Sequence, residues 1–174
     1  MELSSIHEQI QAYKLCFEKT ITDISFEEFD KIFFCKWYFY NRTTPMDIQE
    51  QFAHITLTIV EGMLRHHLGE IDYFTNAKGQ SFLSRYDNEI LQEKEKQIEE
   101  YYLTLAALLK QSAALISVFD KAIFHKLLSA AYKEITDYTK FSHETNLSLS
   151  ENLLAKKKEL HVEKKKRHES SIFS

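Results

Sequence analysis

The chain has 174 residues, a formal net charge of −4 and 44% hydrophobic residues, values typical of one globular domain rather than a disordered chain. It contains only three glycines and one proline, and because sheets and hairpins depend on these residues at their turns, the composition favours helices. No apolar run reaches the ~20 residues of a membrane span, and the N-terminus lacks the apolar segment of a signal peptide. We therefore expect a cytoplasmic protein.

Two capping boxes mark the first two predicted helices. The stretch from Ser5 to Glu8 opens a helix of about 5 to 21, and the stretch from Ser25 to Glu28 opens one of about 26 to 41. The spacing of the aromatic residues predicts that the second helix turns one aromatic side toward the core. Its members are Phe26, Phe29, Phe33, Trp37 and Tyr40.

The clearest start signal of the sequence opens the third predicted helix. Thr44 is the expected N-cap, Pro45 suits the first turn because no N–H donor is needed there, and Asp47 complements the helix dipole. The helix is predicted to run to Leu68, with Gly69 ending it in the left-handed conformation. A loop of about 75 to 80 should follow.

The second half of the chain is predicted to form three more helices. Residues 82–140 contain no strong breaker and predict helices of about 82–111 and 113–139, the latter central because it is apolar nearly all round. The polar first half of the 82–111 helix is expected to be solvated, and its projection beyond the bundle is an open alternative. A polar connection at 140–148 then precedes a final helix of about 149–167, capped by the stretch from Ser148 to Glu151.

These elements predict an all-α fold, a single antiparallel bundle of five to six helices with a basic C-terminal helix. Charge is divided unevenly along the chain. Residues 155–169 hold seven basic and three acidic residues, a net +4, whereas the rest holds 15 basic and 23 acidic residues, a net −8. We therefore predict an acidic helical bundle in residues 1–147 and a C-terminal helix with a basic polar tail in residues 148–174.

His66 is the candidate cofactor ligand. A helical wheel places it within the apolar stripe of the third predicted helix, with His67 on the flank. Because neutral histidine is the commonest metal ligand, haem or a metal held by His66 is one hypothesis. The favoured interpretation is a helix terminus, where a protonated histidine interacts with the last carbonyl groups. No glycine-flanked serine nucleophile or phosphate-binding glycine loop occurs, so no catalytic residue is predicted and the protein is expected not to be an enzyme.

Aromatic residues outside the predicted core side form a candidate partner surface. One helix cannot bury every aromatic residue of the stretch 33–41 against one neighbour, unless that helix is central in the bundle. Tyrosine and tryptophan are enriched where proteins bind each other. The residues predicted to contact a partner are Phe34, Tyr38, Phe39, Tyr101 and Tyr102.

The basic tail is the last candidate site. Its cations are Lys156, Lys157, Lys158, Lys164, Lys165, Lys166 and Arg167. They could bind nucleic acid, an anionic membrane or the acidic part of the same chain, but a solvated helix end is favoured, since cations suit a helix C-terminus.

The favoured function is a non-enzymatic, cytoplasmic interaction or regulatory protein that binds another protein or a second copy of itself. The first alternative is a helical sensor with haem or a metal held by His66, and the second is nucleic-acid or membrane binding by the basic tail.

Overall fold

The computed structural model describes the backbone of residues 3–41, 47–77 and 85–172, and these residues form helices and no strands. The all-α prediction is confirmed. Seven helices are found in the described residues, against the five to six predicted: α1 (Leu3–Thr20), α2 (Phe26–Phe33), α3 (Cys35–Tyr40), α4 (Ile48–Ala77), α5 (Arg85–Glu93), α6 (Glu95–Ser117) and α7 (Lys121–Ile172).

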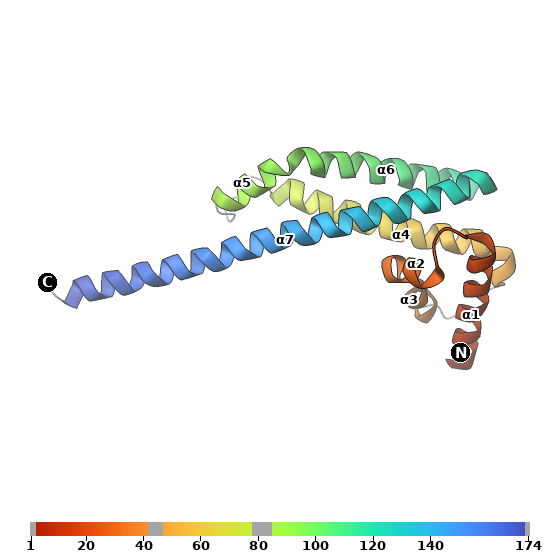
Figure 1. Ribbon diagram of the computed structural model, residues 1–174, viewed down its shortest axis with the longest axis horizontal. Coiled ribbons are helices and arrows are strands. Elements are labelled where there is room, and N and C mark those ends of the chain that lie inside the picture. The colour runs from red at the N-terminus through yellow and green to blue at the C-terminus, as the bar shows by residue number, and fades with distance from the viewer. Residues whose placement is uncertain (1–2, 42–46, 78–84, 173–174) are drawn as a thin grey trace.

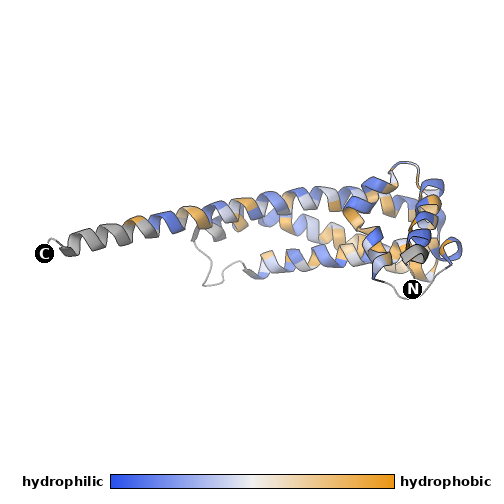
Figure 2. Cartoon of the chain, turned by 90° about the horizontal axis from the view of Figure 1, so that it is seen from below, coloured by the Kyte–Doolittle hydropathy of each residue, from blue (hydrophilic) through white to orange (hydrophobic). Residues whose placement is uncertain are grey.

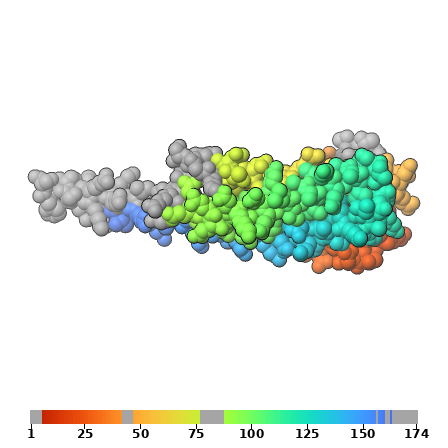
Figure 3. Space-filling model, turned by 90° about the horizontal axis from the view of Figure 1, so that it is seen from above, coloured from red at the N-terminus to blue at the C-terminus, as the bar shows by residue number. Residues whose placement is uncertain are grey.

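Three long helices form the body of the molecule. Helices α4, α6 and α7 lie side by side, and α6 runs in the opposite direction to the other two (Figure 1). Helices α1, α2 and α3 pack at one end of this body, where hydrophobic residues are concentrated (Figure 2). Helices α5 and α6 cover one face (Figure 3), and the C-terminal part of α7 extends beyond every other helix.

An aromatic cluster joins the three short helices to the body. The Tyr13 ring is fully buried and lies within 5.2–6.4 Å, centroid to centroid, of four phenylalanine rings. Its hydroxyl is hydrogen-bonded to Thr56 Oγ1 of α4 at 2.9 Å. Burial raises the pKa of Tyr13 well above its ordinary value, so the phenol stays neutral. Rings that bury this much area from different helices fix the position of α1 and α2 on α4.

The helix predicted at 26–41 is two helices. Its start is confirmed, because the Ser25 side chain accepts a hydrogen bond from the Glu28 N–H at 3.2 Å and Glu28 Oε2 accepts one from the Ser25 N–H at 3.1 Å. The continuous helix is wrong, since Phe34 adopts the left-handed conformation (φ 51°, ψ 44°) and ends α2.

This break changes which residues face the core. Phe26, Phe29 and Phe33 precede it and are buried as predicted. After the break the helix restarts in a new register, so Cys35 and Phe39 turn inward instead of Trp37 and Tyr40. The predictions of a buried Trp37 and an outward-facing Phe39 are therefore wrong.

Two predicted helix boundaries in the first half of the chain are wrong. Helix α1 begins at Leu3, so Ser5 lies inside it and is not its cap. Helix α4 continues past Gly69 to Ala77, because Ile71 and Phe74 are buried and their burial outweighs the ~1 kcal/mol helix penalty of a glycine.

Asp47 caps the N-terminus of α4. The Glu50 N–H donates to Asp47 Oδ1 at 3.1 Å, which places Asp47 as the capping side chain of a helix that begins at Ile48. The predicted cap Thr44 and the predicted first-turn residue Pro45 lie outside the described residues. The loop predicted at 75–80 is wrong for residues 75–77, which are helical and belong to α4, and residues 78–80 lie outside the described residues.

The later boundaries also differ from the prediction. The region predicted as one helix at 82–111 is split at Lys94 into α5 and α6, and Leu91 and Ile98 are buried, so this region packs and does not project. The next break falls at 118–120 rather than near residue 112.

The predicted connection at 140–148 is helical. Phe141 and Thr145 are buried there, which keeps α7 packed and continuous, and the Ser148 side chain donates to the Glu144 carbonyl instead of capping a new helix. The division into residues 1–147 and 148–174 stays a prediction.

Candidate functional site

An apolar groove of about 740 Å³ lies between α2–α3 and α4. We call it the aromatic groove. Its polar lining includes Lys31 of α2, Thr58 of α4 and Thr139 of α7, and His66 and His67 lie on the α4 side. Its apolar lining consists of Ile32, Phe33, Phe34, Trp37, Tyr38, Ile59 and Met63, with Gly62 on the wall formed by α4. A volume between ~300 and 1,000 Å³ with mostly apolar walls is typical of binding sites.

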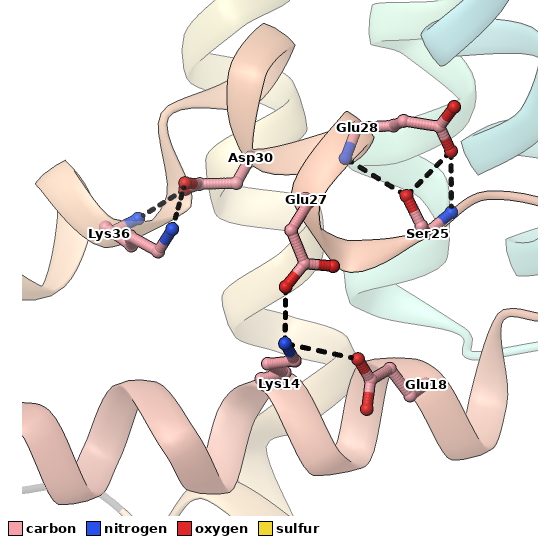
Figure 4. Close-up of polar contacts among 7 residues, drawn as sticks. All are labelled: Lys14, Glu18, Ser25, Glu27, Glu28, Asp30 and Lys36. Atoms are coloured by element: carbon pink, nitrogen blue, oxygen red, sulfur yellow. Dashed lines mark hydrogen bonds and ion pairs between the residues drawn. The ribbon is translucent and has the colours of Figure 1, made fainter.

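The left-handed break at Phe34 forms one side of the aromatic groove. The Phe34 N–H donates to the Asp30 carbonyl at 2.8 Å, while the Asp30 carboxylate accepts the Lys36 N–H at 2.8 Å and pairs with Lys36 Nζ at 3.0 Å. Asp30 thus bonds to both sides of the break (Figure 4). In this conformation 57% of the Phe34 surface and 67% of the Trp37 surface are solvent-exposed.

Charged contacts hold α2 against α1 behind this break. Lys14 of α1 pairs with Glu27 of α2 and, at 3.6 Å, with Glu18 of its own helix (Figure 4). The hydrogen bond from Lys14 lowers the pKa of Glu27, and the hydrogen bond from Ser25 lowers the pKa of Glu28. Both carboxylates are therefore charged at neutral pH, and both support the position of α2.

The adjacent histidines His66 and His67 of α4 are placed in the reverse of the predicted order. His66 is exposed and His67 is buried, with 8% of its surface accessible. The buried stripe in the second half of α4 runs through Val60, Leu64, His67, Ile71 and Phe74, at helical spacings of three and four. The predicted stripe through His66 holds only for the first half of the helix, so His66 lies at the groove edge rather than in the core.

His67 is held in place by its neighbours. Its Nδ1 lies 2.7 Å from Glu70 Oε2, and its ring meets the Tyr138 ring of α7 edge-on at 5.1 Å. Burial lowers the pKa of His67, although Glu70 acts in the opposite direction. Burial and then the negative charge of Glu70 raise the pKa of Tyr138. The imidazole is therefore mainly neutral at pH 7, which is the form of histidine that binds metal ions.

The five aromatic residues predicted to contact a partner do not form one surface. Phe34 and Tyr38 line the aromatic groove, whereas Phe39 is buried. Tyr101 is half-buried and packs on α7, and Tyr102 borders a separate hollow of about 360 Å³. The groove residue that sequence reasoning missed is Trp37, because an unbroken helix would have turned it inward.

The basic tail lies on the extended part of α7. Lys157 and Lys158 are exposed there. The other predicted cations fall on side chains outside the described residues: Lys156, Lys164, Lys165, Lys166 and Arg167. Across the described ranges, the helices are all too short or too polar to cross a membrane.

The chain matches no protein-family model, no curated protein and no solved structure.

Proposed function

We propose that the protein is a non-enzymatic interaction protein that binds one helix of a partner protein in the aromatic groove. The observation that carries the proposal is the exposure of Trp37 and Phe34 beside an apolar hollow. Tryptophan and other aromatic residues contribute most of the binding energy in many protein interfaces. Burial of such side chains against a partner lowers the free energy of the complex, because it removes apolar surface from water.

The backbone of Phe34 supports the same proposal. The left-handed conformation costs a bulky residue about 1–2 kcal/mol, which is why glycine usually occupies such positions. Most of the Phe34 side chain is exposed, so packing within the chain offsets little of this cost. Strained residues of this kind cluster at binding sites. A function for the exposed phenyl ring explains why the position is not glycine.

The chemistry of the groove indicates the partner. A helix bound in a groove presents apolar side chains at positions i, i+3 or i+4, and i+7. At Gly62 a Cβ atom would meet no atom within 4 Å, so this part of α4 leaves room for such a side chain. Lys31 at the edge favours a partner helix with an acidic flank. We therefore propose as the partner another protein that presents such a helix.

The cytoplasmic location predicted from the sequence is part of the same proposal. It is supported by Cys16 and Cys35, which are both free, as expected in a reducing compartment.

The proposal is tested first by comparing what wild-type protein and Trp37→Ala capture from a cell lysate. A protein retained by the wild type and lost with Trp37→Ala is then purified and titrated directly. Because Trp37 is the single tryptophan of the chain, its fluorescence reports burial in the groove. We expect a saturable blue shift on binding. Identical capture by the two proteins would show the proposal to be wrong.

Two leucine substitutions separate a blocked groove from a damaged fold. Gly62→Leu places a side chain into the groove, whereas Gly69→Leu adds the same side chain to the same helix outside it. Leucine is the better helix former at both positions, so neither change should lower stability. We expect Gly62→Leu to weaken partner binding at least tenfold and Gly69→Leu to leave it unchanged. Equal affinities would place the partner elsewhere.

Haem binding by His66 and ligand binding by the basic tail have less support. His66 is exposed at the groove edge, so a haem bound through it would lack the enclosing pocket that keeps haem out of water. On the extended part of α7, Lys158 lies between Leu154 and Val162 on one stripe of the helix. A helix that binds along a membrane surface has its apolar residues on one face and its charged residues on the other. Here a lysine lies between two apolar residues on the same face, so the two kinds of residue are not separated. The tail is therefore proposed to be a solvated helix end.

A further inference from the structure

Three potential metal ligands meet in the second half of α4. His66, His67 and Glu70 each offer one ligand atom, and all three atoms lie within 4.8 Å of one another. Helical geometry brings them together, because residues three and four apart in sequence are neighbours on the helix surface and Glu70 is reached from both histidines. The imidazole rings of His66 and His67 lie 5.2 Å apart.

This cluster is more ordered than a set of surface side chains. His67 is buried, is hydrogen-bonded to Glu70 at 2.7 Å, and is packed against the Tyr138 ring. The Tyr138 ring therefore fixes the orientation of the His67 imidazole, and the contact with Glu70 already brings two of the three potential ligand atoms side by side. His66 is exposed and Glu70 is half-buried, so an ion can reach the cluster from solvent.

We propose that His66, His67 and Glu70 bind one divalent transition-metal ion of the Zn²⁺ class. Two imidazole nitrogens and one carboxylate oxygen suit Zn²⁺ and its neighbours, and do not suit Ca²⁺ or Mg²⁺, which prefer oxygen ligands alone. Three protein ligands leave one position of a tetrahedral ion open to water or to another ligand.

The required movement is small. Ligands of a tetrahedral Zn²⁺ at ~2.0–2.1 Å from the ion are about 3.3 Å apart. His67 Nδ1 and Glu70 Oε2 are 2.7 Å apart and need to separate only slightly, and rotation of the exposed His66 side chain brings its ring nitrogen close enough to both.

His66 and His67 also line the aromatic groove, so the ion would lie beside it. Metal binding goes beyond the proposed partner binding and does not depend on it.

The test is titration of the full chain, freed of metal by a chelator, with Zn²⁺ alone by calorimetry and with Co²⁺ alone by visible absorption. We expect one Zn²⁺ per chain and a Co²⁺ spectrum typical of tetrahedral coordination. Single substitutions His66→Ala and Glu70→Gln should each weaken binding at least tenfold. His66 is exposed, so His66→Ala leaves the core intact, which circular dichroism verifies. His67→Ala should have the same effect on the affinity for Zn²⁺.

Matched controls distinguish this site from chance binding. His54→Ala removes another exposed histidine of α4, and His143→Ala removes one of α7, and neither should change the affinity. Affinity unchanged in His66→Ala and Glu70→Gln, or no saturable binding by the wild type, would overturn the proposal. Failure of the two proposals is distinguishable, because Trp37→Ala should lose the partner and keep Zn²⁺, whereas Glu70→Gln should lose Zn²⁺ and keep the partner.

Discussion

The segment of residues 26–40 and helix α7 differ in how closely their structure follows their local sequence. The first contains no glycine, proline or asparagine, yet it is broken at Phe34. Helix α7 contains the polar stretch 140–148, yet it runs without interruption for 52 residues. In both segments the outcome depends on burial. Phe33, Cys35 and Phe39 can all reach the core only if the helix changes direction, whereas Phe141 and Thr145 remain buried only if α7 continues.

The two segments also differ in what they leave exposed. The break at Phe34 places Phe34 and Trp37 beside a groove of defined shape, whereas the end of α7 exposes a few apolar residues, such as Leu153 and Leu154, among many charged ones and beside no hollow of comparable volume in the described residues. Single exposed apolar residues are normal on a protein surface, but an apolar hollow edged by polar groups indicates a binding site. We therefore propose the segment 26–40 as the functional region and α7 as support.

The largest effect that tests this contrast is expected from Phe29→Ala. Phe29 is fully buried, with its ring 4.8 Å from that of Phe17 and 4.2 Å from that of Phe33. Loss of the ring should lower the free energy of unfolding by about 3–5 kcal/mol. Leu153→Ala in the extended part of α7 is the matched change at an exposed position and should cost less than about 0.5 kcal/mol. Urea unfolding measures both, and similar costs would mean that α7 is packed there.

Phe34→Gly should increase stability. Glycine adopts the left-handed conformation without strain, and after allowance for its greater freedom in the unfolded chain the gain should be about 1 kcal/mol. The same substitution should weaken partner binding, because it removes an exposed anchor of the groove. Phe34→Ala is the control, since it removes the ring but keeps a Cβ atom and most of the strain. A Phe34→Gly protein less stable than Phe34→Ala would contradict the strain argument.

The sequence predicted parts of the structure that depend on local rules. The capping box at Ser25 and the burial of Phe26, Phe29 and Phe33 followed from hydrogen bonding and spacing within one turn or two. The break at Phe34 could not be predicted, because no residue there favours the left-handed conformation and tertiary packing alone selects it.

The candidate sites were predicted less well than the fold. The sequence predicted His66 as a possible ligand, but the buried histidine of the cluster is His67. The first half of α4 packs against α1 and the second half against α6 and α7, so a different side of the helix is buried in each half. Glu70 became a possible ligand only once α4 was seen to continue through Gly69. A helix that ended at Gly69, as the sequence predicted, would not place Glu70 one turn from both histidines.

The capping box of α2 provides an effect of intermediate size. Ser25→Ala should lower the free energy of unfolding by about 1 kcal/mol, because the Glu28 N–H loses its partner. Ser25→Thr, which keeps the hydroxyl group, is the control and should retain most of the stability. Equal losses in the two variants would mean that the serine hydroxyl does not act as the cap.

The same capping box predicts a pH dependence. The folded protein lowers the pKa of Glu28 below the ordinary 4.5, so its stabilising effect is fully present above that pH and is lost as the pH falls through the lowered folded-state value. Glu28→Gln should therefore be less stable than the wild type above pH 4.5, and the difference should shrink on acidification. Unfolding by urea at a series of pH values measures it. A difference that stays constant down to acidic pH would show that the charge of Glu28 does not contribute.

The smallest effect is expected from deletion of residues 155–174, which removes the basic tail. An isolated helix of this length is only marginally stable in water, and Leu154, Lys157 and Lys158 at its start are exposed. Deletion should therefore change the free energy of unfolding by less than about 0.5 kcal/mol, at low and at high salt alike. Binding to duplex DNA and to anionic vesicles should be equally weak with and without the tail.

If the tail instead binds phosphate, log K should fall by about 0.9 per phosphate neutralised for each tenfold rise in salt, and the deletion should abolish that binding. If it instead folds back on the acidic body of the chain, the deletion should destabilise the protein, and more strongly at low salt.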